Sequence, residues 1–369
     1  MAIYIERLNI NCFRGIHSLE MSKFNHVNII AGDNNSGKTS VLEAIHLLRN
    51  PAEFNNILRV ALTREIGIRG GLSTMYEDFT NLFSRNYDPM KISIDAICNE
   101  KPVDLCLTGA ESLILLSSEI AFQNHSTMRR LELTKKYGSS FETNVFEGEL
   151  QYTLNKKSGN SPVEIHAHGK KNSKKLEKKD YLNIVYLSPF SHMRMETFNS
   201  ILSDDIYKEI CVTVLQMFDP EILDIFYLKD EITSQTVEYV KNSRIGNMPL
   251  STYGDGIKKI LAIANGIAKA VKGVLMIDEL ETSIHSRYYS DIFRFVIKAC
   301  KQFQVQLFVT THSMETIDEL LVAQDYSNHD SDAVSVITLK KDVDKTYSRT
   351  LTGRHVLSNR EEFGFEVRL

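Results

Sequence analysis

The sequence has no excess of positive charge. Its 43 lysines and arginines stand against 47 aspartates and glutamates, which gives the 369 residues a formal net charge of −4. A constitutive nucleic-acid-binding protein usually has a basic domain, so any contact with DNA would have to be local or conditional. The hydrophobic content of 43% excludes disordered and collagen-like classes. The length fits two domains, or one large domain with insertions.

Cysteine is scarce and scattered. The five cysteines form no CxxC pair and no cluster with histidine; they are Cys12, Cys98, Cys106, Cys211 and Cys300. This pattern argues against a zinc site and against a disulfide framework. It predicts buried thiols in a reducing compartment.

Long hydrophobic runs are missing as well. The most membrane-like stretch, residues 260–277, is interrupted at helical spacing by Asn265, Lys269 and Lys272, so it is better divided into an amphipathic helix and a buried strand. The N-terminal residues 1–16 carry charges within their apolar run and have no signal-peptide cleavage pattern. We therefore expect a cytoplasmic protein that makes no contact with a membrane.

Hydrophobic periodicity predicts an α/β chain. Strands are predicted at residues 3–10, 26–30, 91–98, 148–154, 182–187, 274–277, 305–310 and 333–339. Helices are predicted at residues 39–48, 204–218, 257–271 and 287–300, and from residue 314 onward. The alternation in the second half implies a parallel sheet that is covered on both faces. The strands at 91–98 and 148–154 suggest an antiparallel accessory sheet.

A lysine-rich segment occupies residues 166–180. It contains six lysines and almost no apolar residue, namely Lys170, Lys171, Lys174, Lys175, Lys178 and Lys179. A segment of this composition cannot bury a core, and we expect a mobile loop. A contact with DNA or with an acidic protein is the alternative interpretation.

Residues 32–39, GDNNSGKT, match the pattern G-x-x-x-x-G-K-[ST] between a predicted strand and a predicted helix. Backbone N–H groups of such a loop face phosphates, Lys38 would neutralise β- and γ-phosphate charge, and the Thr39 hydroxyl would bind Mg²⁺. A glycine turn before a helix is the plainer alternative. The candidate nucleotide-binding residues here are Gly32, Asn34, Asn35, Ser36, Gly37, Lys38, Thr39 and Ser40.

Two further strand ends carry reactive side chains. Residues 273–279, GVLMIDE, end in Asp278, which would hold Mg²⁺ through water, and Glu279, which would act as the general base on the attacking water. Taken alone, this pair would be a solvated strand terminus, but a phosphate loop needs a carboxylate from another strand. His312 follows the next apolar strand, so it is expected at the same sheet edge, in contact with the γ-phosphate.

Together these motifs resemble those of the ATP-binding-cassette ATPases of the SMC/RecF branch, and within it the compact OLD-like bacterial ATPases without a Toprim nuclease domain. The matching segments are residues 5–15 (IERLNINCFRG), 32–39, 250–256 (LSTYGDG), 278–285 (DELETSIH) and 310–313 (TTHS). The resemblance covers both ends of the chain and is weak between about residues 89 and 181.

The resemblance implies ATP and Mg²⁺ as ligands, with Thr39 and Asp278 at the metal, and a homodimer or higher oligomer in which two subunits sandwich two ATP molecules. It places Ser251, Gly254, Asp255 and Gly256 in a signature loop that completes the partner's site, although the segment departs from the common LSGGQ pattern and could be an ordinary helix N-cap.

The resemblance also places Arg14 near the nucleotide, with an ordinary surface arginine as the alternative. Glu281 and His285 fall in a segment through which opposed sites communicate, or they simply pack at a helix start. The glutamine that couples ATP to the accessory region of such proteins is not identified in this sequence.

The implied fold is an α/β P-loop NTPase of the ABC/SMC-head type. It would have a mixed parallel sheet flanked by helices, an N-terminal antiparallel β portion and an inserted α+β accessory region. We expect an N-terminal ATPase lobe at residues 1–88, the accessory insertion at 89–181 and a C-terminal ATPase lobe at 182–369.

The implied function is ATP hydrolysis coupled to dimer association, a switch in anti-phage defence or DNA maintenance. Only residues 313–369 follow His312, too few for a nuclease domain, so the effector, a nuclease or toxin, is expected to be a separate protein. The first alternative is a RecF-type repair ATPase that acts directly on DNA. The second is the nucleotide-binding subunit of a transporter.

Overall fold

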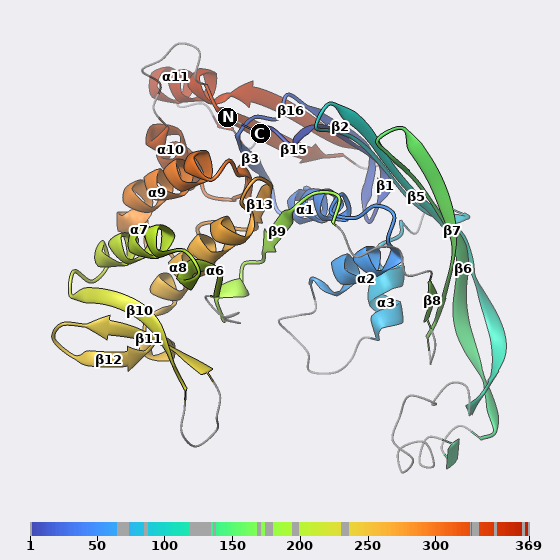
Figure 1. Ribbon diagram of the computed structural model, residues 1–369. Helices are drawn as coiled ribbons and strands as arrows, with labels where there is room; N and C mark the ends of the chain where they lie inside the picture. The colour runs from blue at the N-terminus through green and yellow to red at the C-terminus, as the bar shows by residue number, and fades with distance from the viewer. Residues whose placement is uncertain are drawn as a thin grey trace.

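The computed structural model places two large sheets side by side (Figure 1). It describes residues 2–64, 74–84, 88–118, 134–135, 138–167, 171–173, 180–193, 199–229, 236–324, 326, 332–342, 345–363 and 366–367.

The first sheet has six strands in the order β16-β15-β3-β14-β13-β9. Neighbouring strands are parallel throughout except for β16, which runs antiparallel to β15 at the edge. The bounds are β3 Val27–Gly32, β9 Ile184–Leu187, β13 Val274–Ile277, β14 Gln306–Thr310, β15 Val334–Lys341 and β16 Thr346–Thr352. Every residue of the central strands β3, β14 and β13 is buried, which explains their continuous apolar runs.

Helices cover both faces of this sheet (Figure 1). One hydrophobic core contains Ile30 of β3 together with Val41 and Ile45 of α1, and it continues into the second sheet. A separate core on the other face joins the same strands to α8, α9 and α10. The main helices of this region are α1 Lys38–Leu47, α7 Asp205–Gln216, α8 Asp255–Lys269, α9 Tyr289–Gln302, α10 Met314–Ala323 and α11 Gly353–Phe363.

The second sheet has seven antiparallel strands in the order β2-β1-β4-β5-β6-β7-β8. Its bounds are β1 Ile5–Phe13, β2 Ile16–Ser22, β4 Met90–Cys98, β5 Lys101–Ser117, β6 Ser140–Leu154, β7 Lys157–His166 and β8 Lys171–Ser173. The N-terminal hairpin therefore shares one sheet with strands of the expected accessory insertion. The domain boundary between residues 88 and 89 stays a prediction.

The predicted strands and helices are present, with ends shifted by the surrounding structure. The strand expected at residues 148–154 begins earlier, at Ser140, because β6 pairs along its length with the long strand β5. Helices α2 Phe54–Leu62 and α3 Met75–Thr80 lie within residues 51–89, for which the sequence predicts a mixed helical and loop segment. The sequence patterns missed other elements, namely β2, β5, β7, β16, α11, α6 Asn199–Leu202, β10 Ile222–Lys229, β11 Thr236–Asn242 and β12 Gly246–Pro249. Strands β10 to β12 form a separate three-stranded sheet.

The lysine-rich segment differs from the expected loop. Residues 171–173 form β8, which pairs with β7, whereas residues 168–170 and 174–179 lie outside the described part of the chain. The five cysteines are free thiols, and all except the partly exposed Cys106 are buried. Among the described residues, none of the helices is both long enough and apolar enough to cross a membrane.

Candidate nucleotide-binding site

The loop after β3 has the backbone of a phosphate loop. Gly32 has a φ of +144°, and a Cβ there would lie 2.4 Å from the carbonyl oxygen of Leu339. Gly37, at the start of α1, has a φ of +99°, and Asn35 between them has a φ of +64°. Glycine tolerates such angles, as asparagine does to a lesser degree. The two motif glycines are therefore required by backbone shape.

The loop can accept an anion. Gly37, the N-cap of α1, has no side chain that could cap the helix, and the first turn contains no acidic residue. The N–H groups of that first turn can therefore bind phosphate oxygens. The Ser36 hydroxyl is buried and has no hydrogen-bond partner among the described residues. A buried hydroxyl without a partner is costly, and a phosphate oxygen would satisfy it.

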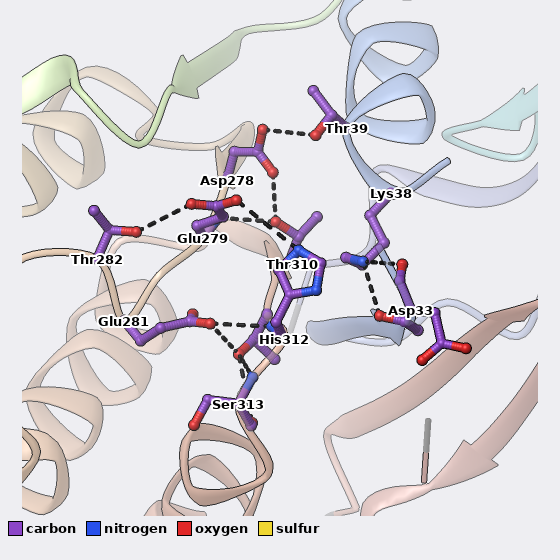
Figure 2. A network of polar contacts seen from close by, with 12 residues as sticks. Asp33, Lys38, Thr39, Asp278, Glu279, Glu281, Thr282, Thr310, His312 and Ser313 are labelled. Carbon is purple, nitrogen blue, oxygen red and sulfur yellow. Dashed lines mark hydrogen bonds and ion pairs between the residues drawn. The ribbon is translucent and has the colours of Figure 1, made fainter. Parts of the chain in front are cut away.

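Lys38 folds back over the loop (Figure 2). Its Nζ donates to the carbonyl oxygens of Gly32 and Asp33, both at 2.8 Å, and its side chain is only 5% exposed. Burial lowers the pKa of Lys38, and the negative charge of Asp278 opposes this effect. A charge held in this position complements a negatively charged ligand.

Asp278 lies at the C-terminal end of β13 and is 4% exposed. Its Oδ2 accepts hydrogen bonds from the hydroxyls of Thr39 at 3.0 Å and Tyr186 at 3.2 Å. Its Oδ1 accepts one from the Thr310 hydroxyl at 2.5 Å. Figure 2 shows the carboxylate between Thr39 and Thr310. The predicted partnership of Thr39 with a carboxylate from another strand is present.

The chemistry of this donor set fits Mg²⁺. The cation prefers oxygen ligands and usually binds through one or two carboxylates, substrate phosphates and water. The adjacent oxygens of Thr39 and Asp278 meet this description. No cluster of three or more histidine, cysteine or acidic side chains that could hold a metal occurs in the described ranges, and a Mg²⁺–nucleotide site does not need one.

Glu279 and His312 face each other at the edge of this site. Glu279 Oε1 lies 3.9 Å from His312 Nε2, and the two side chains are 43% and 36% exposed. Glu279 has a φ of +48°, a strained conformation that is typical of functional sites. Its N–H donates to the Thr310 hydroxyl at 2.8 Å, which fixes this backbone. The geometry leaves both side chains accessible to a water molecule and a phosphate.

Glu281 fixes the loop that carries His312. Its Oε1 accepts hydrogen bonds from the Thr311 hydroxyl at 2.8 Å and from the His312 N–H at 3.0 Å (Figure 2). Lys259 of α8 is 1% exposed, and burial lowers its pKa to about 8, while the negative charge of Glu281 is the main effect that opposes this lowering.

His285 accepts a hydrogen bond from the Arg287 N–H at 3.3 Å and so caps a short 3₁₀ helix, Ser286–Tyr288.

Arg14 is not an ordinary surface arginine. Its side chain is 11% exposed and forms a 2.7 Å ion pair with the buried Glu43 of α1. Arg64 pairs with the same carboxylate at 2.7 Å and also donates to the Ser40 hydroxyl at 3.1 Å. Burial lowers the pKa of Arg14, opposed first by Glu43. Arg14 is thus attached to the phosphate-loop helix through Glu43.

The candidate signature loop lies at the start of α8. Ser251 belongs to a short 3₁₀ helix, Leu250–Thr252, and Gly254 is the N-cap of α8 without a side-chain hydrogen bond. Ser251, Gly254 and Asp255 are exposed, and a Cβ on Gly254 would meet nothing within 4 Å. None of the hydrogen bonds described above for Lys38 and Asp278 involves a residue of this loop. Its role in a partner's site stays a prediction.

Sequence reasoning missed several residues that shape the site. Thr310 is the first residue of the TTHS segment, and its position at a strand end is the signal that could have indicated its role. Tyr186, Glu43, Arg64 and Lys259 carry no local signal, because their contacts join elements that are distant in the chain.

The fold and the site define a P-loop NTPase, with the α/β architecture expected of the ABC/SMC-head type. Residues 3–213 match the family model described as "AAA ATPase domain", and residues 122–318 match the model described as "AAA domain, putative AbiEii toxin, Type IV TA system". Each match spans more than half of the chain. The protein belongs to the AAA ATPase domain family.

The individual proteins that the chain resembles share low sequence identity with it or match only a short part of it. The chain is similar to an ATP/GTP phosphatase of Helicobacter pylori, with 24% identity over 387 residues that cover 95% of this chain and 96% of the relative. It is 36% identical over 63 residues to the DNA replication and repair protein RecF of Xanthomonas euvesicatoria, covering 17% of each chain. The solved SmcHead bound to the C-winged helix domain of ScpA superposes with a TM-score of 0.49 and 13% identity, covering 96% of this chain and 100% of that one.

Proposed function

We propose that the protein is an ATP-hydrolysing switch whose nucleotide sites assemble and separate with the ATP cycle. The observation that carries the proposal is the carboxylate of Asp278, which accepts a hydrogen bond from Thr39 of the phosphate-loop helix. The same sheet edge carries Glu279 and His312. Phosphate-binding groups and a candidate general base therefore converge on one place, as ATP hydrolysis requires.

The residues of the chain take distinct roles in this proposal. Lys38 and the N–H groups of the phosphate loop bind the phosphates, while Thr39 and Asp278 hold Mg²⁺. Held there, Mg²⁺ would supply positive charge that neutralises the negative charge developing on the phosphates. Glu279 accepts a proton from the attacking water. His312, which Glu281 holds by its backbone N–H, donates to the γ-phosphate.

We propose further that two subunits share each site. Glu279 and His312 are partly exposed, and the N-terminus of α8 has no side-chain cap and begins beside the exposed residues Ser251 and Gly254. A helix N-terminus of this kind suits an anion. These features support a homodimer in which the signature loop of one subunit contacts the γ-phosphate bound by the other.

The biological setting that we propose is anti-phage defence or DNA maintenance, with a separate nuclease or toxin as effector. The family description that names a toxin of a type IV toxin–antitoxin system supports the defence setting. The local similarity to RecF favours a second candidate, a repair ATPase that acts directly on DNA. ATP-dependent, salt-sensitive binding to DNA would favour the second candidate over the first.

The test is phosphate release from Mg²⁺-ATP by the purified full chain, with light scattering to measure its mass with and without ATP. The proposal expects turnover that depends on Mg²⁺, and ATP-dependent formation of dimers. Absence of phosphate release by the wild-type protein would contradict the enzymatic part. A monomer at saturating ATP would contradict the shared sites.

A further inference from the structure

Tyr186 joins β9 to the carboxylate at the end of β13. The two strands are parallel neighbours, and Tyr186 pairs in register with Met276, two residues before Asp278. The Asp278 N–H donates to the carbonyl oxygen of Leu187 at 2.9 Å, so the two backbones remain joined beyond the strand ends. The hydroxyl of Tyr186 then reaches forward to Oδ2 of Asp278 at 3.2 Å.

A residue of α1 packs against the ring of Tyr186. The ring stacks on His46, with ring centroids 5.9 Å apart and planes 22° from parallel. Burial lowers the pKa of His46 to about 4, so this imidazole is neutral at neutral pH and packs as an uncharged ring. Because the Tyr186 ring, attached to β9, packs against His46 of α1, it can hold its hydroxyl in one direction, which a freely rotating side chain cannot do.

The hydrogen bonds to Asp278 are divided between its two oxygens. Thr310 donates to Oδ1, whereas Tyr186 and Thr39 donate to Oδ2. An ionised carboxylate has about four lone-pair sites. Tyr186 and Thr39 both donate to Oδ2, and Thr310 occupies one site on Oδ1. The hydroxyl of Tyr186 is therefore a donor to Oδ2 of Asp278. We place the cation at the edge of the carboxylate beside the Thr39 hydroxyl.

We infer that Tyr186 is a positioning residue for the metal-binding carboxylate: its hydroxyl orients Asp278 toward Thr39, so that the pair is preorganised for Mg²⁺ bound with a nucleotide. The inference rests on the proposed nucleotide site and adds a residue to it. Hydrogen-bond partners of metal ligands commonly change metal affinity or activity by about 10- to 100-fold when they are removed.

The Tyr186→Phe variant tests this role directly, because it removes the hydroxyl and keeps the ring that stacks on His46. Binding of a fluorescent N-methylanthraniloyl ATP analogue to the full chain is measured in EDTA and across a Mg²⁺ titration. We expect the Mg²⁺ concentration at half-saturation to rise about 10-fold or more, while binding in EDTA stays within about twofold of wild type. Tyr347→Phe, at an exposed tyrosine of β16, is the matched control and should behave as wild type.

A double-mutant cycle with Asp278→Asn separates positioning from packing. If Tyr186 acts through Asp278, its removal should have no further effect on Mg²⁺-dependent binding in the Asp278→Asn background. An unchanged Mg²⁺ titration for Tyr186→Phe, equal losses in both backgrounds, or failure of the variant to fold would each overturn the inference. A wild-type protein that binds the analogue without any response to Mg²⁺ would overturn the proposed metal site as well, which distinguishes the two failures.

Discussion

The Thr39 hydroxyl donates a hydrogen bond of 3.0 Å to Oδ2 of Asp278, although 239 positions separate the two residues in the chain. The strand order explains the meeting. β14 lies between β3 and β13, and Thr310 at its end bonds to the same carboxylate. Three successive parallel strands thus bring their C-terminal ends to one site, the usual place for ligands in an open α/β sheet.

Replacing Lys38 by alanine should strongly weaken nucleotide binding. The Nζ of Lys38 is held above the loop by two carbonyl oxygens, and hydrogen bonds to charged groups are worth about 1.5–3 kcal/mol each. We expect at least about a 10-fold loss in affinity for ATP, measured by isothermal titration calorimetry. Lys298→Ala, at an exposed position on α9, is the control. Unchanged affinity in Lys38→Ala would refute the phosphate-loop assignment.

Replacing Glu279 by glutamine should slow hydrolysis and preserve binding. The substitution keeps the size of the side chain but removes the base, and general-base catalysis contributes about 10²–10⁴ in rate. Phosphate release should fall by that factor, ATP affinity should stay nearly unchanged, and an ATP-bound dimer should accumulate in gel filtration. Glu209→Gln, at an exposed position on α7, controls for the loss of charge. Wild-type turnover in Glu279→Gln would exclude Glu279 as the base.

Local patterns predicted the central strands of the ATPase sheet because these are buried on both faces. The strand at residues 274–277 coincides with β13, whose four residues are all buried. The phosphate loop was predictable for a similar reason, since Gly32 and Gly37 occupy backbone conformations that demand glycine. Where the physical reason for a structure lies within one short segment, the sequence of that segment is sufficient to predict the structure.

Contacts between distant segments were not predictable in this way. The pairing of Arg14 with Glu43, and of Tyr186 with Asp278, depends on how α1 and β9 pack against their neighbours. The small sheet β10–β12 was missed as well, although its strands form antiparallel ladders. The short strand β8 was hidden by the lysine-rich composition, because backbone pairing with β7 supplies hydrogen bonds that composition does not reveal.

Mixing two inactive variants tests whether sites are shared between subunits. Ser251→Arg should block the signature loop, while Lys38→Ala should disable the phosphate loop. In a mixed dimer, the defective phosphate loop of one subunit faces the defective signature loop of the other. Both defects then fall in one composite site, and the second composite site is intact. We therefore expect limited ATPase activity to return on mixing, measured as phosphate release. Each variant incubated alone is the control, and the absence of rescue would contradict the shared-site model.

The buried Lys259 should make stability depend on pH in the alkaline range. Burial lowers its pKa to about 8, whereas the unfolded chain has a lysine pKa of about 10.4. Between these values the unfolded state binds more protons than the native state, so the free energy of unfolding rises with pH. Below about pH 8 both states are protonated and the contribution is constant. The slope is at most about 1.4 kcal/mol per pH unit.

Lys259→Met should remove this slope because methionine fills the same space without a titratable group. Urea unfolding at a series of pH values from 7 to about 10.5 measures it. We expect wild type to gain stability relative to the variant as the pH rises through this window. Lys258→Met is the matched control, since the neighbouring Lys258 pairs with Asp255 at the surface of the same helix. If the free energies of unfolding of wild type and Lys259→Met changed in parallel with pH, the native protein would keep Lys259 charged. Its ammonium group would then be one of the charges that hold Glu281 and the His312 loop in place.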